Sequence, residues 1–308
     1  MSMGSALAFP RGESDGDAAA NIFQQSDPRG FYRVMFGLDY DLPDSASVLV
    51  RQMLRKRRAA LGRPLKVLDL GCGYGTLPAL IRYALDMDQL AHRYRDLDWS
   101  EIDTDKLIAM DRHYFAAWPE LVDARFIGFD VHEYAPNYAK SVGLIDHVIE
   151  SSPDTGALRD EDRDALKDVD MIVSLNCADF ISDTAFQTLL GAIATEDLWT
   201  AMFALRVSPI YGLQSALEAR GLEHETLAGA TFVQRRFASS QEWTQVLLAL
   251  ENQGLASVGK EADGLLHAAL HVMRPRAAID ATPLHQLVSV NHSQSLTFAK
   301  WRRRPWGV

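Results

Sequence analysis

A glycine-rich turn, placed between a short apolar run and an amphipathic segment, constrains this chain more than any other feature. Residues 65–70 read Leu-Lys-Val-Leu-Asp-Leu, and residues 71–75 read Gly-Cys-Gly-Tyr-Gly. Apolar side chains then recur at the spacing of one helical face, at Leu77, Leu80, Ile81, Ala84 and Leu85. A strand that passes through glycines directly into a helix is typical of open α/β sheets, in which ligands bind beyond the carboxyl ends of the strands.

The same alternation of short apolar runs and helical segments continues along the chain. Further strands are predicted at residues 124–130, 147–150, 170–175, 200–207 and 265–273. Amphipathic segments separate these runs, which is the pattern of a parallel sheet with crossover helices. The sequence therefore predicts an α/β fold with a doubly wound, seven-stranded and mostly parallel sheet.

The chain divides into a main domain and three flanking or inserted parts. The main domain is predicted to span residues 65–274, with residues 86–123 as a helical insertion between its first two strands. A long continuous helical segment is predicted to form an N-terminal cap at residues 21–64. Residues 1–20 are rich in small and polar residues without an apolar period, so we expect them to be disordered. Residues 275–308 form a C-terminal extension that either packs on the core or mediates a homodimer.

Composition excludes several classes of protein. The formal net charge is −10, from 31 Lys and Arg against 41 Asp and Glu, whereas proteins that coat nucleic acid or anionic membranes need a basic face. No apolar run approaches the roughly 20 residues of a membrane-spanning helix, and no secretory signal is recognised. Two cysteines, Cys72 and Cys177, are too few for a disulfide scaffold or a Cys-rich zinc site. We therefore expect a cytoplasmic protein with no metal, nucleic-acid or membrane partner.

An acidic residue two places before the first glycine limits which ligand the turn can take. A turn that binds the pyrophosphate of a dinucleotide has the spacing G-x-G-x-x-G, whereas here the spacing is G-x-G-x-G. Asp69 would repel a pyrophosphate, but it could attract a cation such as the amino group of an amino-acid-like ligand. The turn therefore favours a ligand that carries such a group.

At these residues the sequence resembles the class I S-adenosylmethionine-dependent methyltransferases, whose first motif has the form acidic-x-G-x-G-x-G. Asp69, Gly71, Gly73 and Gly75 match this motif place by place. The resemblance covers about residues 65–274 and implies a Rossmann-like methyltransferase fold with S-adenosyl-L-methionine as cofactor. It implies an enzyme that methylates N or O of a small-molecule acceptor, either a specialised metabolite in a biosynthetic pathway or an amino-acid-like compound. Two alternatives stay open: a nicotinamide-dependent oxidoreductase, and a methyltransferase-fold scaffold without catalysis.

The resemblance also implies an acidic residue at the end of the second strand, which holds the ribose hydroxyls. Asp103 and Asp130 compete for this place. We expect Asp130, because residues 126–129 form a better buried strand than residues 99–102 and because this choice leaves seven strands. Asp103 then belongs to a helix N-terminus. The other cofactor-binding residues that the resemblance implies are Cys72, Val131, Glu150, Ser151, Ser174 and Asn176.

The acceptor site is expected above the sheet, between the N-terminal segment, the insertion and the stretch after the fifth strand. Family members that methylate DNA bases or protein glutamine carry Asn-Pro-Pro-Tyr after the fourth strand, but residues 174–177 here read Ser-Leu-Asn-Cys, which favours a small molecule. Arg235 either binds a carboxylate or phosphate of the substrate or pairs with an acid such as Glu242. The candidate catalytic residues are Tyr32, Tyr40, Arg206, Tyr211 and His267.

Overall fold

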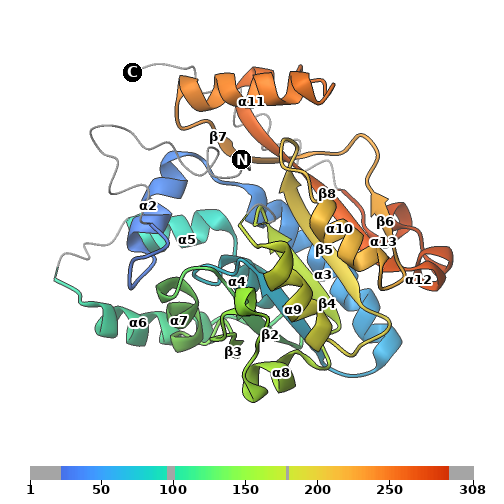
Figure 1. The fold of residues 1–308 in the computed structure, drawn as a ribbon. Helices are drawn as coiled ribbons and strands as arrows, with labels where there is room; N and C mark the ends of the chain where they lie inside the picture. Colours follow the sequence, from blue (N-terminus) through green and yellow to red (C-terminus); the bar gives the residue numbers. More distant parts are fainter. Residues whose placement is uncertain (1–21, 96–100, 178–179, 291–308) are drawn as a thin grey trace.

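The computed structural model describes residues 22–95, 101–177 and 180–290 (Figure 1). The disorder expected at residues 1–20 falls outside these ranges. Within them, no helix combines the length and the apolar character that crossing a bilayer requires.

One mixed sheet forms the centre of the molecule, and its strands follow the order β3-β2-β1-β4-β5-β8-β6, with β7 also paired to β8. The strands are β1 (Leu65–Leu70), β2 (Ala124–Phe129), β3 (His147–Val148), β4 (Met171–Leu175), β5 (Trp199–Leu205), β6 (Leu222–Thr226), β7 (Phe232–Arg236) and β8 (Leu265–Pro275). β1 to β5 pair in parallel, and β8 runs antiparallel to β5. The doubly wound, mostly parallel α/β sheet that we predicted is confirmed.

The sheet has eight strands, one more than predicted. The extra strand arises because β8 is eleven residues long and two short strands share its outer edge. β6 pairs with residues 271–275 of β8, and β7 pairs with residues 265–268. Neither β6 nor β7 was among the strands that the sequence placed by residue number. The sequence of β6, Leu-Glu-His-Glu-Thr, has a single buried residue and lacks the apolar alternation of a half-buried strand.

Helices cover both faces of this sheet. They are α2 (Arg29–Gly37), α3 (Leu42–Leu61), α4 (Thr76–Arg82), α5 (Met87–Arg95), α6 (Thr104–Ala116), α7 (Tyr134–Ser141), α8 (Asp160–Leu166), α9 (Asp183–Ala192), α10 (Tyr211–Glu218), α11 (Ser240–Asn252), α12 (Arg276–Ala281) and α13 (Leu284–Leu287). In Figure 1, α9 and α10 lie in front of the sheet and α3 lies behind it. Val67 of β1 packs into the cluster that contains α3, whereas Leu68 packs into the cluster that contains α9 and α10. Burial on both faces explains why the central strands read as nearly continuous apolar runs.

Residues 22–64 of the N-terminal cap are mostly helical, but they form two helices, α2 and α3, and not one segment. The break lies between α2 and α3, where Asp39 has a φ of +54°. Pro43 stands in the first turn of α3, where its missing N–H is tolerated but where it restricts the backbone before it. Tyr40 lies in this break and packs against both the core cluster that contains α3 and the cluster that contains α2.

The insertion contains α5 and α6 and packs against the cap and α7. Asp103 begins α6 as expected, because its carboxylate accepts a hydrogen bond from the Lys106 backbone N–H at 2.8 Å. The fully buried carboxylate of Asp111 connects α6 to α5 and α7. It accepts hydrogen bonds from the hydroxyls of Tyr94 and Tyr138 and pairs with Arg93.

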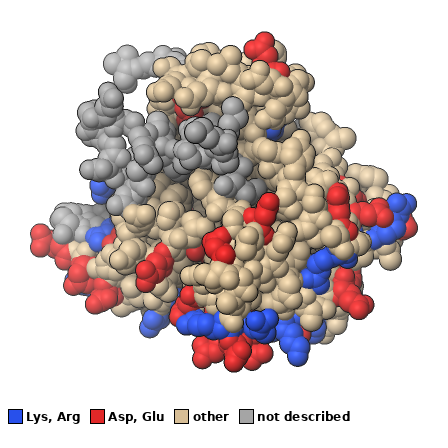
Figure 2. All heavy atoms as spheres, in the orientation of Figure 1, with Lys and Arg blue, Asp and Glu red and all other residues tan. Residues whose placement is uncertain are grey.

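Charged side chains on the face shown in Figure 2 gather along the lower edge and around α12, and the two signs are intermixed there. Arg276 of α12, for example, pairs with both Glu223 and Asp280. Such exposed pairs contribute little to stability, about 0–1 kcal/mol each.

The start of α11 provides a local test of the fold. The Ser239 hydroxyl accepts a hydrogen bond from the Glu242 backbone N–H at 3.1 Å. We expect Ser239→Ala to lower the free energy of unfolding by about 1 kcal/mol, because an N–H of the first turn loses its partner. Urea unfolding measures this, with the exposed neighbour Ser240→Ala as control. Equal losses in both variants would contradict a capping role.

Candidate active site

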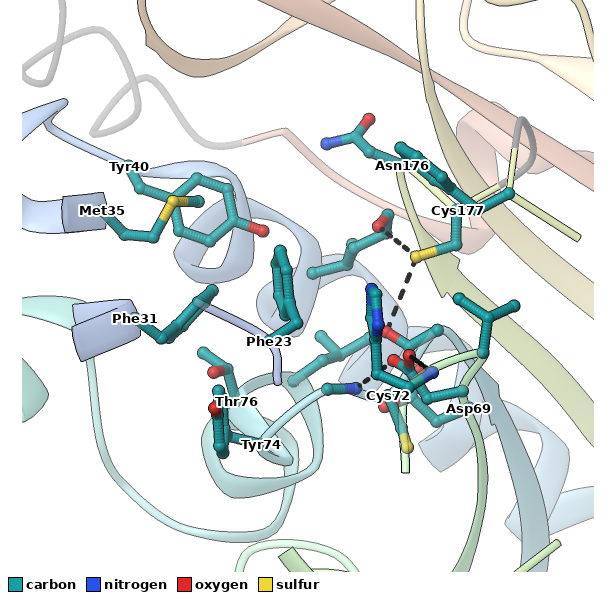
Figure 3. A pocket seen from close by; sticks show the side chains of 18 of the residues that line it. Phe23, Phe31, Met35, Tyr40, Asp69, Cys72, Tyr74, Thr76, Asn176 and Cys177 are labelled. Atoms are coloured by element: carbon teal, nitrogen blue, oxygen red, sulfur yellow. Dashed lines mark hydrogen bonds between the residues drawn. The ribbon is translucent and has the colours of Figure 1, made fainter. Parts of the chain in front are cut away.

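A pocket of about 280 Å³ lies at the carboxyl ends of β1, β2 and β4, beside the place where the strand order reverses (Figure 3). This is where open α/β sheets bind ligands. One wall comes from the glycine turn after β1 and from the residues that follow β2. The N-terminal cap, the residues after β4, and β7 supply the other walls.

The backbone conformation of the turn and its close contact with the residues after β4 require glycine. Gly71, Gly73 and Gly75 have φ angles of +75°, +48° and +76°, in the left-handed region that disfavours side chains. A Cβ on Gly71 would lie 1.9 Å from the Cys177 Sγ, so only glycine lets the turn approach the residues after β4. Gly71, Cys72 and Gly73 line the pocket, and Gly75 precedes α4 as its N-cap.

Asp69 presents a buried carboxylate to this pocket. Its side chain is only 2% exposed, and its Oδ2 has no hydrogen-bond partner among the residues described. Burial and the nearby negative charge of Asp130 raise the pKa of Asp69 to about 8. A buried carboxylate without a partner is unfavourable unless a ligand supplies a hydrogen-bond donor or a positive charge. Perturbed groups of this kind cluster at functional sites.

Asp130, and not Asp103, follows the second strand and lines the pocket. Its Oδ2 accepts a hydrogen bond from the Gly73 N–H at 2.8 Å, and its Oδ1 accepts one from the His132 N–H at 2.9 Å. These bonds fix the carboxylate beside the glycine turn, although burial still raises its pKa. Val131 lies at the pocket rim, half exposed.

Four of the expected cofactor residues do not line the pocket: Gly75, which precedes α4 as its N-cap, and three residues whose side chains are held by nearby groups. Glu150 pairs with Arg159 at 2.9 Å, and Ser151 donates to Asp162 at 2.5 Å. The Ser174 hydroxyl is buried and donates to the Leu70 carbonyl at 3.0 Å. Asn176, in contrast, lines the pocket.

Of the five candidate catalytic residues, only Tyr40 lines the pocket. Tyr32 is buried behind it and shares a hydrogen bond with the Thr76 hydroxyl at 3.0 Å. Two others are engaged elsewhere, since Arg206 pairs with Glu261 at 2.5 Å and His267 contacts Thr231 at 3.1 Å. Tyr211 is 75% exposed on α10.

The sequence analysis did not identify several residues that line the pocket. They are Phe23, Met35, Ile181, Leu205 and Gln234. The apolar members gave no signal that separates a pocket wall from ordinary core. None of the described residues of the insertion, 86–95 and 101–123, lines the pocket, since α5 and α6 pack against the cap and α7. Within residues 22–95, 101–177 and 180–290, no group of three or more His, Cys, Asp or Glu side chains could hold a metal ion.

Comparison with known proteins returns similar structures only. No family model and no curated protein matches the chain. The plantazolicin methyltransferase BpumL, solved with SAH, is 14% identical over 89% of this chain and 96% of its own, with a TM-score of 0.40. A TehB-like SAM-dependent methyltransferase from Corynebacterium glutamicum is 14% identical over 73% and 88%, with a TM-score of 0.35. Magnesium protoporphyrin IX methyltransferase from Synechocystis, solved with SAM, is 10% identical over 89% and 98%, also with a TM-score of 0.35. Likeness at this level leaves the activity to be inferred from the chain's own site.

Proposed function

We propose that this chain is an S-adenosylmethionine-dependent methyltransferase that acts on an oxygen or nitrogen atom of a small molecule. The observation that carries the proposal is the buried, unpartnered carboxylate oxygen of Asp69 beside a close-approach glycine turn. An ammonium group on the ligand would give this carboxylate the partner that the described residues do not provide.

The residues around the pocket fit S-adenosylmethionine. Asp69 would hold its amino group, and the backbone at Gly71 and Gly73 would lie against its amino-acid portion. Each Asp130 oxygen accepts one backbone hydrogen bond and keeps a further lone pair, so both can accept from ribose hydroxyls. Val131 stands where it would cover the nucleoside from the rim.

When bound, this cofactor would supply an electrophilic methyl carbon, which the acceptor's lone pair takes as the carbon–sulfur bond breaks and the acceptor loses a proton to water. The chain's own contribution is positioning, which in favourable cases lowers a barrier by roughly 7–11 kcal/mol. Phe23, Phe31 and Met35 line the pocket with apolar side chains, against which an acceptor could be positioned. The Tyr40 hydroxyl, whose pKa burial raises further above neutral pH, is protonated and can donate a hydrogen bond.

A nicotinamide dinucleotide is disfavoured by the same charges. Its pyrophosphate would have to lie near the acidic side chains of Asp69 and Asp130, both of which line the pocket, and this anion could not pair with either of them as an ammonium group can. Titration calorimetry of the full chain with S-adenosylhomocysteine and with NAD separates the two ligands. We expect S-adenosylhomocysteine to bind and NAD not to bind. The absence of heat with S-adenosylhomocysteine, or preferential binding of NAD, would overturn the proposal.

The affinity for S-adenosylhomocysteine should rise between pH 6 and pH 8. In the free protein the Asp69 carboxyl, with a pKa of about 8, is protonated below that pH. Pairing with the ligand's ammonium group requires the carboxylate, so binding must release a proton. The dissociation constant should therefore fall by up to about tenfold per pH unit and level off near pH 8. Calorimetry at pH 6, 7 and 8 measures this, and buffers of different ionisation enthalpy count the released proton at pH 7. An affinity that does not change over this range would contradict the assignment.

A further inference from the structure

The pocket has a second polar feature besides its carboxylates: both amide atoms of Asn176 and the amide oxygen of Gln234 find no hydrogen-bond partner among the residues that the structure describes. Asn176 follows β4, and Gln234 belongs to β7. Figure 3 shows Asn176 on the side of the pocket away from Asp69 and Cys72, toward the cap residues Met35 and Tyr40. Gln234 lies beside that part of the cap, because its carbonyl accepts a hydrogen bond from the backbone N–H of Asp41 at 2.9 Å.

A β-bulge turns Gln234 into the pocket. Val233 pairs with His267 of β8, and Arg235 pairs with the adjacent Leu266, so Gln234 is an extra residue without a partner on β8. In a regular strand, Gln234 and Arg235 would point to opposite faces. Here both are buried, at 8% and 2% exposure, and both line the pocket. The Gln234 Oε1 is buried and accepts no hydrogen bond from the described residues.

Asn176 is held in the pocket wall by an unusual backbone. Its φ of +55° lies in the left-handed region, which Asn tolerates better than most residues. Its backbone N–H donates to the Phe203 carbonyl at 2.7 Å, which fixes the position of the chain there. Both polar atoms of its side-chain amide are buried, and neither finds a partner in the part of the chain that the structure describes. Strained backbone and unmade hydrogen bonds together are typical of ligand sites.

The charge at this end of the pocket is already balanced. Arg235 makes two hydrogen bonds to the Glu242 carboxylate, at 2.6 and 3.2 Å, and both side chains are almost fully buried. Of the two alternatives that the sequence left open, the structure therefore shows the ion pair. Tyr40 adds no charge, since a tyrosine is neutral near pH 7 and burial raises the pKa of Tyr40 further. Aromatic and apolar side chains, among them Phe31 and Met35, surround these groups.

From these contacts we propose that the methyl acceptor is an uncharged aromatic molecule whose O–H or N–H group is oriented by the amides of Asn176 and Gln234. This rests on the proposed function, and it adds the class of acceptor. The unpartnered oxygens of both amides need a donor, and the Asn176 NH₂ can donate to the acceptor's lone pair. An acceptor with a carboxylate would lose its hydration and find the nearby guanidinium already paired.

Two naphthalene probes of similar size test the inference: 2-naphthol, which is neutral at pH 7, and 2-naphthoate, which is an anion. Their dissociation constants with the full chain are measured by fluorescence titration, with and without saturating S-adenosylhomocysteine. We expect 2-naphthol to bind at least about tenfold more tightly than 2-naphthoate. Asn176→Ala and Gln234→Ala should each weaken 2-naphthol about five- to tenfold. The exposed amide of Asn252 on α11 gives the matched control, since Asn252→Ala should change neither affinity.

The variant Asn176→Asp tests whether Asn176 contacts the ligand or only supports the fold. Asn176→Asp keeps the size of the side chain and a residue that tolerates a positive φ. It should strengthen binding of the cation 2-naphthylmethylammonium about tenfold or more relative to the unsubstituted chain, a gain that a damaged fold would not produce. Equal affinities for the naphthol and the naphthoate, or unchanged naphthol binding in both alanine variants, would overturn the inference. Because S-adenosylhomocysteine binding is measured in the same samples, its loss would contradict the proposed function separately.

Discussion

Replacing Asp69 by asparagine should weaken S-adenosylhomocysteine binding at least about a hundredfold without destabilising the unliganded protein. Removing one partner of a buried charge pair costs about 2–5 kcal/mol in affinity, which corresponds to this loss. The free energy of unfolding of the ligand-free protein should not fall, because the Oδ2 of the buried Asp69 carboxylate has no hydrogen-bond partner among the described residues. Calorimetry gives the affinity, and urea unfolding gives the stability.

The pH dependence of that stability follows from the direction of the pKa shift. The pKa of Asp69 is about 8 in the folded chain, against an ordinary value of 3.8. Between these values the folded state holds a proton that the unfolded state has lost, so this group makes the folded state less stable as the pH rises. The unfavourable effect is absent below about pH 4 and complete above about pH 8. Asp69→Asn should therefore gain most relative to the unsubstituted chain at pH 8, and least at pH 5.

Asp130 supplies the contrast for this experiment. Asp130→Asn should lower both stability and affinity, because that carboxylate accepts hydrogen bonds from the Gly73 and His132 backbone. Binding of S-adenosylhomocysteine by Asp69→Asn within threefold of the unsubstituted chain would contradict the assigned role. A loss of stability at pH 8 that matches the loss in Asp130→Asn would contradict the electrostatic argument.

The sequence located the part of the site that depends on local backbone chemistry. The turn at residues 71–75 was predictable because glycines that follow an apolar run leave few alternatives to a strand–turn–helix unit. The place of Asp130 was predictable because burial of residues 126–129 outweighs the shorter spacing to Asp103, whose side chain caps α6 as expected. Both inferences use information contained within a few consecutive residues.

The rest of the site depends on contacts between distant segments, which sequence patterns do not record. Gln234 enters the pocket because β7 slips by one residue against β8, and nothing within residues 232–236 specifies that slip. Glu150 and Ser151 follow the third strand as expected, but Arg159 and Asp162 of the next helical region engage them. Tyr40 lines the pocket and follows the break in the cap at Asp39, which the apolar pattern of the sequence did not indicate.

Glu242→Gln should destabilise the protein by about 3–5 kcal/mol, because it removes the carboxylate that makes two hydrogen bonds with the buried guanidinium of Arg235. Urea unfolding measures the loss, and the exposed Glu251→Gln on the same helix should change stability by less than about 0.5 kcal/mol. Adding Arg235→Met to Glu242→Gln should recover most of the loss, since the buried charge is then gone. A double variant no more stable than Glu242→Gln alone would show that the lost stability comes from other contacts of Glu242, such as its hydrogen bond from the Ala238 N–H at 2.7 Å.

Glu242→Gln also tests whether the ion pair between Arg235 and Glu242 determines which ligand the pocket prefers. In Glu242→Gln the Arg235 guanidinium keeps its place in the pocket wall but loses the carboxylate that neutralises it. An anion in the pocket would then restore the balance, so 2-naphthoate should bind about tenfold more tightly to this variant than to the unsubstituted chain and should raise its unfolding midpoint. The affinity for 2-naphthol should change little, because Asn176 and Gln234 are unaltered. If 2-naphthoate affinity did not rise, the preference for an uncharged ligand would have to come from the shape of the pocket and not from its balanced charge.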